Sequence, residues 1–257
     1  MENLAITFEI QKFLLVFFRV AAVIFMVPVF SARMVSGIFK GGLSLLIAYL
    51  LFDVITVNFT AQQDPFVLLA LCVKEVFIGA VIGFVVRLAF NAASMSGEII
   101  SLQSGLSFAR VMDPASQQQV SMIEQIKSLI AVLIFFVIDA HHMLIQGIAY
   151  SLTTLPIGSA SLNAPLAGYL IKATAGLFGA AFRIGAPVIV TLFLVELSFG
   201  IMSRMIPQAN VFVDALPAKI LITVLMLGMS LGYIVPSIAA LFKGLETDFV
   251  RMIRMMG

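Results

Sequence analysis

The run FVLLALCVKEVFIGAVIGFVVRLAF, which extends from Phe66 to Phe90, decides the fold of this chain. A helix needs about 20 predominantly apolar residues to cross a bilayer, and this run is long enough to do so. It begins just after Asp64-Pro65, a pair that marks a helix start. The run therefore predicts a transmembrane α-helix.

Comparable apolar runs follow one another along the rest of the chain: Phe13–Phe30, Leu43–Val57, Leu129–Tyr150, Leu166–Met202 and Ala218–Phe242. The composition agrees, because 61% of the 257 residues are hydrophobic and 11% are charged, whereas soluble domains are about 45–50% apolar and about a quarter charged. We predict an all-α, polytopic integral membrane protein that forms one membrane-embedded domain over residues 1–257. Six spans is the minimum, and seven result if Gly185 and Pro187 break the long fifth run.

Several functional classes find little support in the composition. The net charge is +2 without a run of Lys and Arg, so nothing indicates nucleic-acid binding. Cys72 is the single cysteine and cannot form an internal disulfide. The start Met-Glu-Asn lacks the basic region of a removable signal peptide, so we expect the first apolar segment to remain. Basic residues of the connectors and of the C-terminal tail point to opposite orientations, which leaves the orientation open.

Ionisable side chains inside the apolar runs need partners, because each costs several kcal/mol at bilayer depth when unpaired. For one set we expect contacts between helices or between subunits: Lys74, Glu75, Arg183 and Glu196. For Arg19, Arg87 and Asp139, snorkelling toward the headgroups is an equal alternative. The pairs Gly79-x-x-x-Gly83 and Gly228-x-x-x-Gly232 predict close approach of a neighbouring helix.

Candidate catalytic and metal-binding patterns are weak. His141 and His142 are adjacent, so their side chains are expected to diverge on a helix, and we assign them a structural or interfacial role. The Gly158–Ser161 stretch resembles a serine-hydrolase pattern only faintly and has no convincing base. We therefore predict no catalytic residue, no metal and no cofactor, and a protein that is not an enzyme.

Two polar stretches interrupt the apolar pattern. The first, Ser94–Lys127, is too polar to face lipid and too long and apolar for an idle connector, which predicts a water-lined site. The second, Ser203–Pro217, predicts the polar tip of a helical hairpin, with a hydrogen-bonded connector as the alternative. The expected tip residues are Pro207, Gln208, Asn210, Phe212 and Pro217.

These motifs, in this order, resemble the flagellar biosynthetic protein FliR family, which includes export-gate subunits of type III secretion injectisomes. The resemblance covers nearly the whole chain and is carried by these residues: Gly97-Glu98, Gln103-x-Gly105, Ser107-Phe108-Ala109, Asp113-Pro114, Pro207-Gln208-x-Asn210-Val-Phe212 and Pro217. The sequence of the central stretch Gly105–Gln119 resembles flagellar members of the family more than injectisome members.

The resemblance implies a subunit of the flagellar type III export gate in the bacterial inner membrane, within the flagellar basal body. Its implied partners are FliP and FliQ, and also FlhB and FlhA, and its cargo is unfolded rod, hook and filament proteins. Residues 1–185 would be a FliP-like part that contains the central segment 94–127. Residues 186–257 would be a FliQ-like helical hairpin with a C-terminal tail.

The family also implies that the central segment projects into the pore and plugs the resting gate. The corresponding residues here are Gly105, Phe108, Val111, Met112, Asp113 and Pro114. Phe108, Val111 and Met112 suit a soft seal, since methionine adapts to irregular contacts. Three alternatives remain open: an injectisome subunit, a small-solute transporter that uses Lys74, Glu75 or Glu196 as coupling groups, and a structural scaffold.

Overall fold

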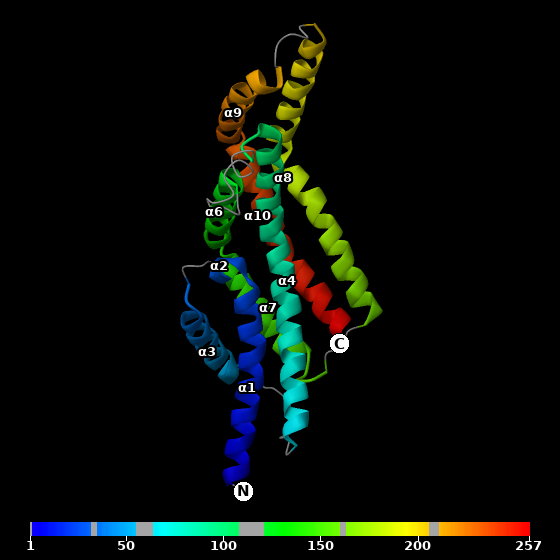
Figure 1. Ribbon diagram of the computed structural model, residues 1–257. Helices are drawn as coiled ribbons and strands as arrows, with labels where there is room; N and C mark the ends of the chain where they lie inside the picture. Colours follow the sequence, from blue (N-terminus) through cyan, green and yellow to red (C-terminus); the bar gives the residue numbers. More distant parts are fainter. Residues whose placement is uncertain (1, 32–34, 55–63, 108–120, 160–162, 206–210) are drawn as a thin grey trace. The chain divides into compact units, whose positions relative to one another are not determined.

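Every regular element in the described part of the chain is a helix, so the predicted all-α fold is confirmed. The computed structural model describes residues 2–31, 35–54, 64–107, 121–159, 163–205 and 211–257. Figure 1 shows the helices: α1 (Glu2–Met26), α2 (Pro28–Ser31), α3 (Gly37–Val54), α4 (Pro65–Ser104), α6 (Met122–Val137), α7 (Ala140–Thr154), α8 (Ala164–Met205), α9 (Val211–Met229) and α10 (Leu231–Met256).

Local side-chain caps fix where several helices begin. The Asp64 carboxylate accepts a hydrogen bond from the Phe66 amide at 2.9 Å, which starts α4. The Asn163 side-chain oxygen accepts from the Leu166 amide at 3.0 Å at the start of α8. Such caps satisfy amides that the first turn of a helix leaves without partners. The helix start predicted from Asp64-Pro65 is therefore confirmed.

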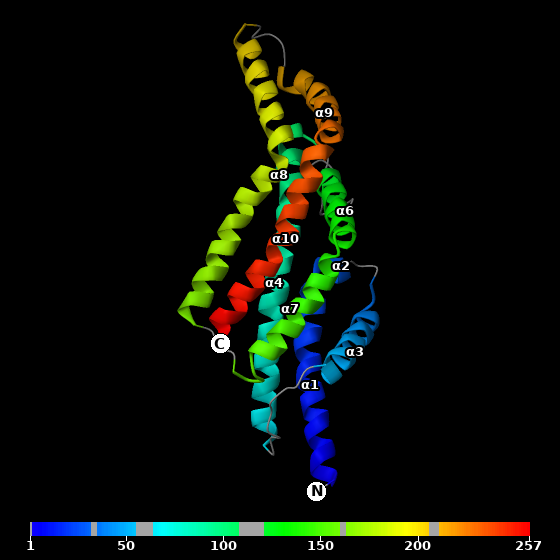
Figure 2. The same ribbon diagram turned by 180° about the vertical axis from the view of Figure 1, so that it is seen from behind.

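The chain divides into two compact units. The first consists of residues 1–88, 139–174 and 242–257, and within it α1 lies beside α4 in both Figure 1 and Figure 2. A Cβ atom on Gly79 would overlap the Arg19 carbonyl oxygen and would lie 2.7 Å from the Ala22 Cβ. Gly83 faces Met26 in the same way. The first glycine pair thus permits close helix packing, as the sequence predicted.

The second unit consists of residues 89–138 and 175–241. Its core brings together side chains from α4, α6 and α8: Ile100, Ile123, Val188, Ile189 and Leu192. Ile222, Met226 and Leu227 of α9 pack against that core. The second glycine pair, Gly228 and Gly232, has no atom of the described residues within 4 Å of an added Cβ, so the close contact predicted there is not formed within this part of the chain.

The structure yields fewer candidate spans than the sequence predicted. Within the described residues, α4 and α8 are long and apolar enough to cross a membrane, and the bent pairs α6–α7 and α9–α10 raise the number from two to at most four. The minimum of six is therefore wrong for this part of the chain. Helix α3 is short, and α1 carries the charged residues Glu9, Lys12 and Arg19 among its apolar ones.

The fifth apolar run forms one helix of 42 residues, α8, with Pro187 inside it. The predicted break at Gly185 and Pro187 is therefore wrong. Pro187 lacks an amide hydrogen, but flanking turns on both sides hold the helix, which changes direction partway along its length (Figure 1). Pro217 and Pro236 likewise lie inside α9 and α10.

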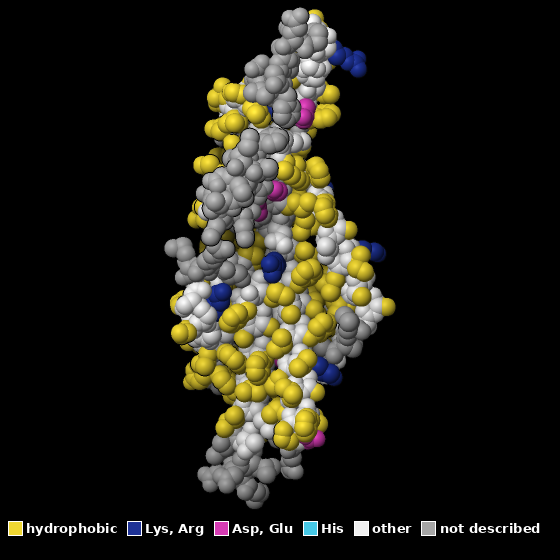
Figure 3. Space-filling model, viewed as in Figure 1, with side chains coloured by type: hydrophobic (Ala, Val, Ile, Leu, Met, Phe, Trp, Pro, Cys, Tyr) yellow, Lys and Arg dark blue, Asp and Glu magenta, His cyan; other side chains and the backbone are white. Residues whose placement is uncertain are grey.

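Large hydrophobic side chains are exposed over both units (Figure 3). Phe66, Phe178 and Leu221 have 82%, 53% and 62% of their surface exposed. A protein in water rarely shows apolar surface of this extent, whereas lipid tails or other membrane subunits would cover it. The surface therefore agrees with a membrane-embedded chain.

Candidate functional site

Within the polar stretch Ser94–Lys127, α4 ends at Ser104 and is followed by a hydrogen-bonded turn. Gly105 adopts a left-handed backbone conformation, with φ of 85°, immediately after the helix ends. The Ser107 amide donates to the Ser101 carbonyl at 3.3 Å, and the Ser107 hydroxyl lies 3.1 Å from the Ser101 hydroxyl. Ser104 also bonds to the Ser101 carbonyl, at 3.1 Å. Because all three serines are buried, this turn is a fixed anchor.

After residues 108–120, the chain begins helix α6 with a hydrogen-bonded cap at Ser121. The Ser121 hydroxyl accepts from the Glu124 amide at 3.2 Å, and the Glu124 carboxylate accepts from the Ser121 amide at 3.4 Å. This reciprocal capping box begins α6. Of the predicted plug residues, Gly105 lies in the first anchor, whereas the others lie outside the described residues: Phe108, Val111, Met112, Asp113 and Pro114.

The two helices that carry these anchors, α4 and α6, pack closely against each other. Gly97 of α4 approaches α6 so closely that an added Cβ would lie 2.6 Å from the Glu124 Cα. The buried Lys127 ammonium donates to the Ser96 hydroxyl at 2.8 Å, one residue before Gly97. Residues 108–120 therefore connect two points on one tightly packed helix pair.

Glu75 lies in a buried ion pair with Arg19. The Arg19 Nε is 2.5 Å from the Glu75 Oε2, and both side chains are 0% exposed. Arg19 also donates to the Ser151 carbonyl at 2.8 Å and to the Leu155 carbonyl at 3.5 Å. Snorkelling of Arg19 is therefore wrong, because its guanidinium points inward and joins α1, α4 and α7.

Lys74 and Glu75 bind the backbone of one residue, Gly158, through its carbonyl oxygen and its amide. The Gly158 amide donates to Glu75 Oε1 at 3.0 Å, and the Gly158 carbonyl accepts from Lys74 Nζ at 2.9 Å. Gly158 has φ of 76°, a left-handed conformation that favours glycine. The stretch that resembled a hydrolase pattern thus begins with a turn docked onto α4.

The remaining charged candidates lie on α8. Glu196 is 58% exposed and forms an ion pair of 3.3 Å with Lys219 of α9, whose side chain is 9% exposed. Arg183 is exposed and lines a cavity of about 440 Å³ together with Tyr233 and Ser237 of α10. Glu196 therefore contacts a neighbouring helix of the same chain.

Replacing Glu196 by Gln tests how much this pair contributes. We expect the free energy of unfolding to fall by about 1 kcal/mol, because water solvates the mostly exposed Glu196 carboxylate and so weakens its attraction to the buried Lys219 ammonium. Denaturant titration of the purified chain in detergent measures it. A loss above about 2 kcal/mol would show that the Lys219 ammonium depends on this carboxylate.

The predicted hairpin tip is shorter than expected. Pro207, Gln208 and Asn210 lie outside the described residues, and Phe212 belongs to the first turn of α9, where side chains are not described. Pro217 is inside α9, so the turn predicted to extend to it is wrong. Pro217 is inside the helix, where it removes one backbone hydrogen bond, and the turns on either side keep the helix formed.

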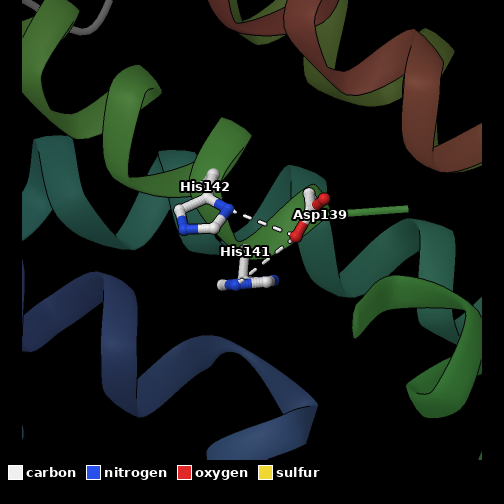
Figure 4. A group of neighbouring side chains, drawn as sticks. All are labelled: Asp139, His141 and His142. Atoms are coloured by element: carbon white, nitrogen blue, oxygen red, sulfur yellow. Dashed lines mark ion pairs between the residues drawn. The ribbon is translucent and has the colours of Figure 1, made fainter. Parts of the chain in front are cut away.

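Asp139, His141 and His142 come together at the start of α7, which the sequence reasoning missed (Figure 4). The two imidazole centroids are 4.1 Å apart, so the predicted divergence is wrong. Asp139 lies between α6 and α7 with a left-handed backbone, φ 56°, and its carboxylate is 3.3 Å from His142 Nδ1 and 3.9 Å from His141 Nε2. The short spacing Asp-x-His-His was the available signal.

Fold and sites define an all-helical membrane protein whose inward-facing charges join its helices. A known family, described as bacterial export proteins, family 1, matches residues 10–245. The chain therefore belongs to this family. Flagellar biosynthetic protein FliR of Bacillus subtilis (strain 168) is 34% identical over 218 residues, which cover 84% of each chain.

Other relatives extend the comparison. FliR of Escherichia coli (strain K12) is 33% identical over 225 residues, covering 88% of this chain and 86% of that protein. Yop proteins translocation protein T of Yersinia pestis is 26% identical over 212 residues, covering 81% of each chain. The flagellar relatives match at higher identity, and the chain is a subunit of the flagellar type III export gate.

Proposed function

We propose that the chain assembles with FliP and FliQ, alongside FlhB and FlhA, into a gate in the bacterial inner membrane. Through this gate, unfolded rod, hook and filament proteins leave the cytoplasm, and the chain itself performs no catalysis. The family match over residues 10–245 carries the proposal. The exposed apolar side chains on α8 and α9 support it, because partner helices could cover them.

The FliQ-like part proposed for residues 186–257 has support in the second unit. The later part of α8 and α9 share the core around Val188 and Ile222. The pair of Glu196 and Lys219 joins the same two helices. Two helices linked in this way suit the proposed hairpin, with residues 206–210 between them.

The plug role proposed for the central segment rests on its two anchors. A segment that seals a pore must keep its ends fixed while its middle yields to cargo. Residues 108–120 are flanked by the buried turn of Ser101 and Ser107, which contains Gly105, and by the capping box of Ser121. The buried Oε1 of Gln103 has no hydrogen-bond partner within the described residues, which leaves an acceptor next to the segment.

A deletion strain and a pull-down test the overall proposal. Cells that lack the chain should fail to export hook and filament proteins and should not swim, and the tagged chain should co-purify with FliP and FliQ. A homo-oligomer without these partners would favour the transporter alternative. Against that alternative, Lys74 and Glu75 already hold the Gly158 turn.

Changing the seal residues tests the plug. Replacing Phe108, Val111 and Met112 together by Ala should raise ion leakage across the membrane severalfold, because Ala removes the side-chain volume that would close the channel. Leakage can be followed with a membrane-potential dye in cells that produce the complete gate.

A matched triple variant controls for lost apolar surface. It replaces the same residue types at exposed helical positions: Phe39, Val67 and Met229. This control should leave leakage unchanged. Equal leakage in both variants would favour the scaffold role over the plug.

A further inference from the structure

Three metal-binding side chains gather at the break between α6 and α7. Asp139, His141 and His142 each offer a ligand atom, and these atoms lie within 4.8 Å of one another. The Asp139 Oδ1 is 3.3 Å from the His142 Nδ1 and 3.9 Å from the His141 Nε2. Figure 4 shows the carboxylate directed toward both imidazoles. The cluster is thus a carboxylate with two imidazoles on one short stretch of chain.

The Asp139 backbone is arranged for this contact. Among the described residues, Asp139 is the non-glycine residue with a positive φ, at 56°. It occupies the N-cap position of α7, where an aspartate usually accepts from amides of the first turn. Within the described structure its side chain makes no such capping hydrogen bond. The carboxylate faces the imidazoles in place of the helix amides, and such unusual backbone conformations concentrate at functional sites.

We propose that Asp139, His141 and His142 bind a divalent transition-metal ion, with Zn²⁺ as the reference ion. Tetrahedral zinc with bonds of about 2.0–2.1 Å places its ligand atoms about 3.3 Å apart. The separation of Asp139 Oδ1 from His142 Nδ1, 3.3 Å, meets that value, whereas His141 Nε2 lies 3.9 Å from the carboxylate and must move closer to both other ligands when the ion binds. Two histidines and one carboxylate leave a further position for water, as in open metal sites.

A dissolved ion can reach this cluster. The Asp139 and His142 side chains are 69% and 64% exposed, and His141 is 31% exposed. The chain contains two histidines in total and a single cysteine, so imidazole-dependent binding can arise nowhere else in it. The bound ion would clamp Asp139 to the first turn of α7 and so stiffen the break. This inference is independent of the proposed export role.

Zinc titration of the purified full-length chain, carrying a tag without histidine, tests the proposal. A competing chromogenic chelator should report one Zn²⁺ per chain. Asp139→Asn and His142→Ala should each weaken binding at least tenfold, because each removes one of three ligands. Asp64→Asn is the matched control, since Asn can still cap α4, and it should bind zinc as the unaltered chain does.

A second measurement needs no variant. Zinc should protect both histidines of the unaltered chain from acylation by diethyl pyrocarbonate, whereas Mg²⁺ should not. Binding that survives the double replacement of His141 and His142 would overturn the proposal. Unprotected histidines at saturating zinc, or equal weakening in the Asp64 control, would do the same.

Discussion

Replacing Glu75 by Ala is expected to destabilise the chain by about 3–5 kcal/mol, the range seen when one partner of a buried ion pair is removed. Arg19 would remain 0% exposed without its carboxylate, and the Gly158 amide would lose its acceptor. α1, α4 and the turn after α7 would all be affected. Denaturant titration in detergent, compared with Glu196→Gln, measures the difference between a fully buried pair and a pair whose carboxylate is exposed.

Two further variants separate charge from packing. Glu75→Gln keeps an acceptor for Gly158 and should cost less than Ala. The double change of Arg19 to Met and Glu75 to Met removes both charges, and apolar replacement of a buried pair is often neutral. It should recover much of the lost stability. If Glu75→Ala unfolds at the same denaturant concentration as the unaltered chain, the pair does not hold these helices together.

The sequence predicted that Glu75 needs a partner but could not identify it. The cost of a charge at bilayer depth follows from residue type alone, whereas Arg19 is 56 residues away and meets Glu75 only because α1 packs on α4. Gly79 contributes to that packing, and its motif was visible in the sequence. Pairing across helices is a property of packing, which periodicity does not encode.

Span number and local breaks were harder to predict for a related reason. Apolar run length recognised α4 and α8, but Pro187 did not break α8, because surrounding turns keep a helix formed around one missing hydrogen bond. Conversely, no residue of a helix-breaking type marked the break at Asp139, which has a left-handed backbone and lies beside the two histidines. Backbone conformation of a single residue lies beyond what composition or periodicity predicts.

The close approach of α4 and α6 can be tested at Gly97. Replacing it by Val is expected to lower the free energy of unfolding by about 3 kcal/mol or more, the upper end of overpacking effects. The reason is the nature of the obstacle: an added Cβ would lie 2.6 Å from the Glu124 Cα and 2.9 Å from its amide nitrogen. Backbone atoms cannot rotate away, so the two helices must separate.

Gly147 provides the matched control, because its added Cβ would meet a side chain, the Phe249 ring, at 2.7 Å. Gly147→Val should therefore cost less than Gly97→Val, and Phe249→Leu should reduce that cost further. Shortening Glu124 to Ala should not rescue Gly97→Val, since the clash is with the main chain. Because Gly97 sets the spacing of both anchors of residues 108–120, Gly97→Val should also reduce export of hook protein, measured in culture supernatants. Rescue through Glu124→Ala would contradict this account and would place the conflict in the side chain.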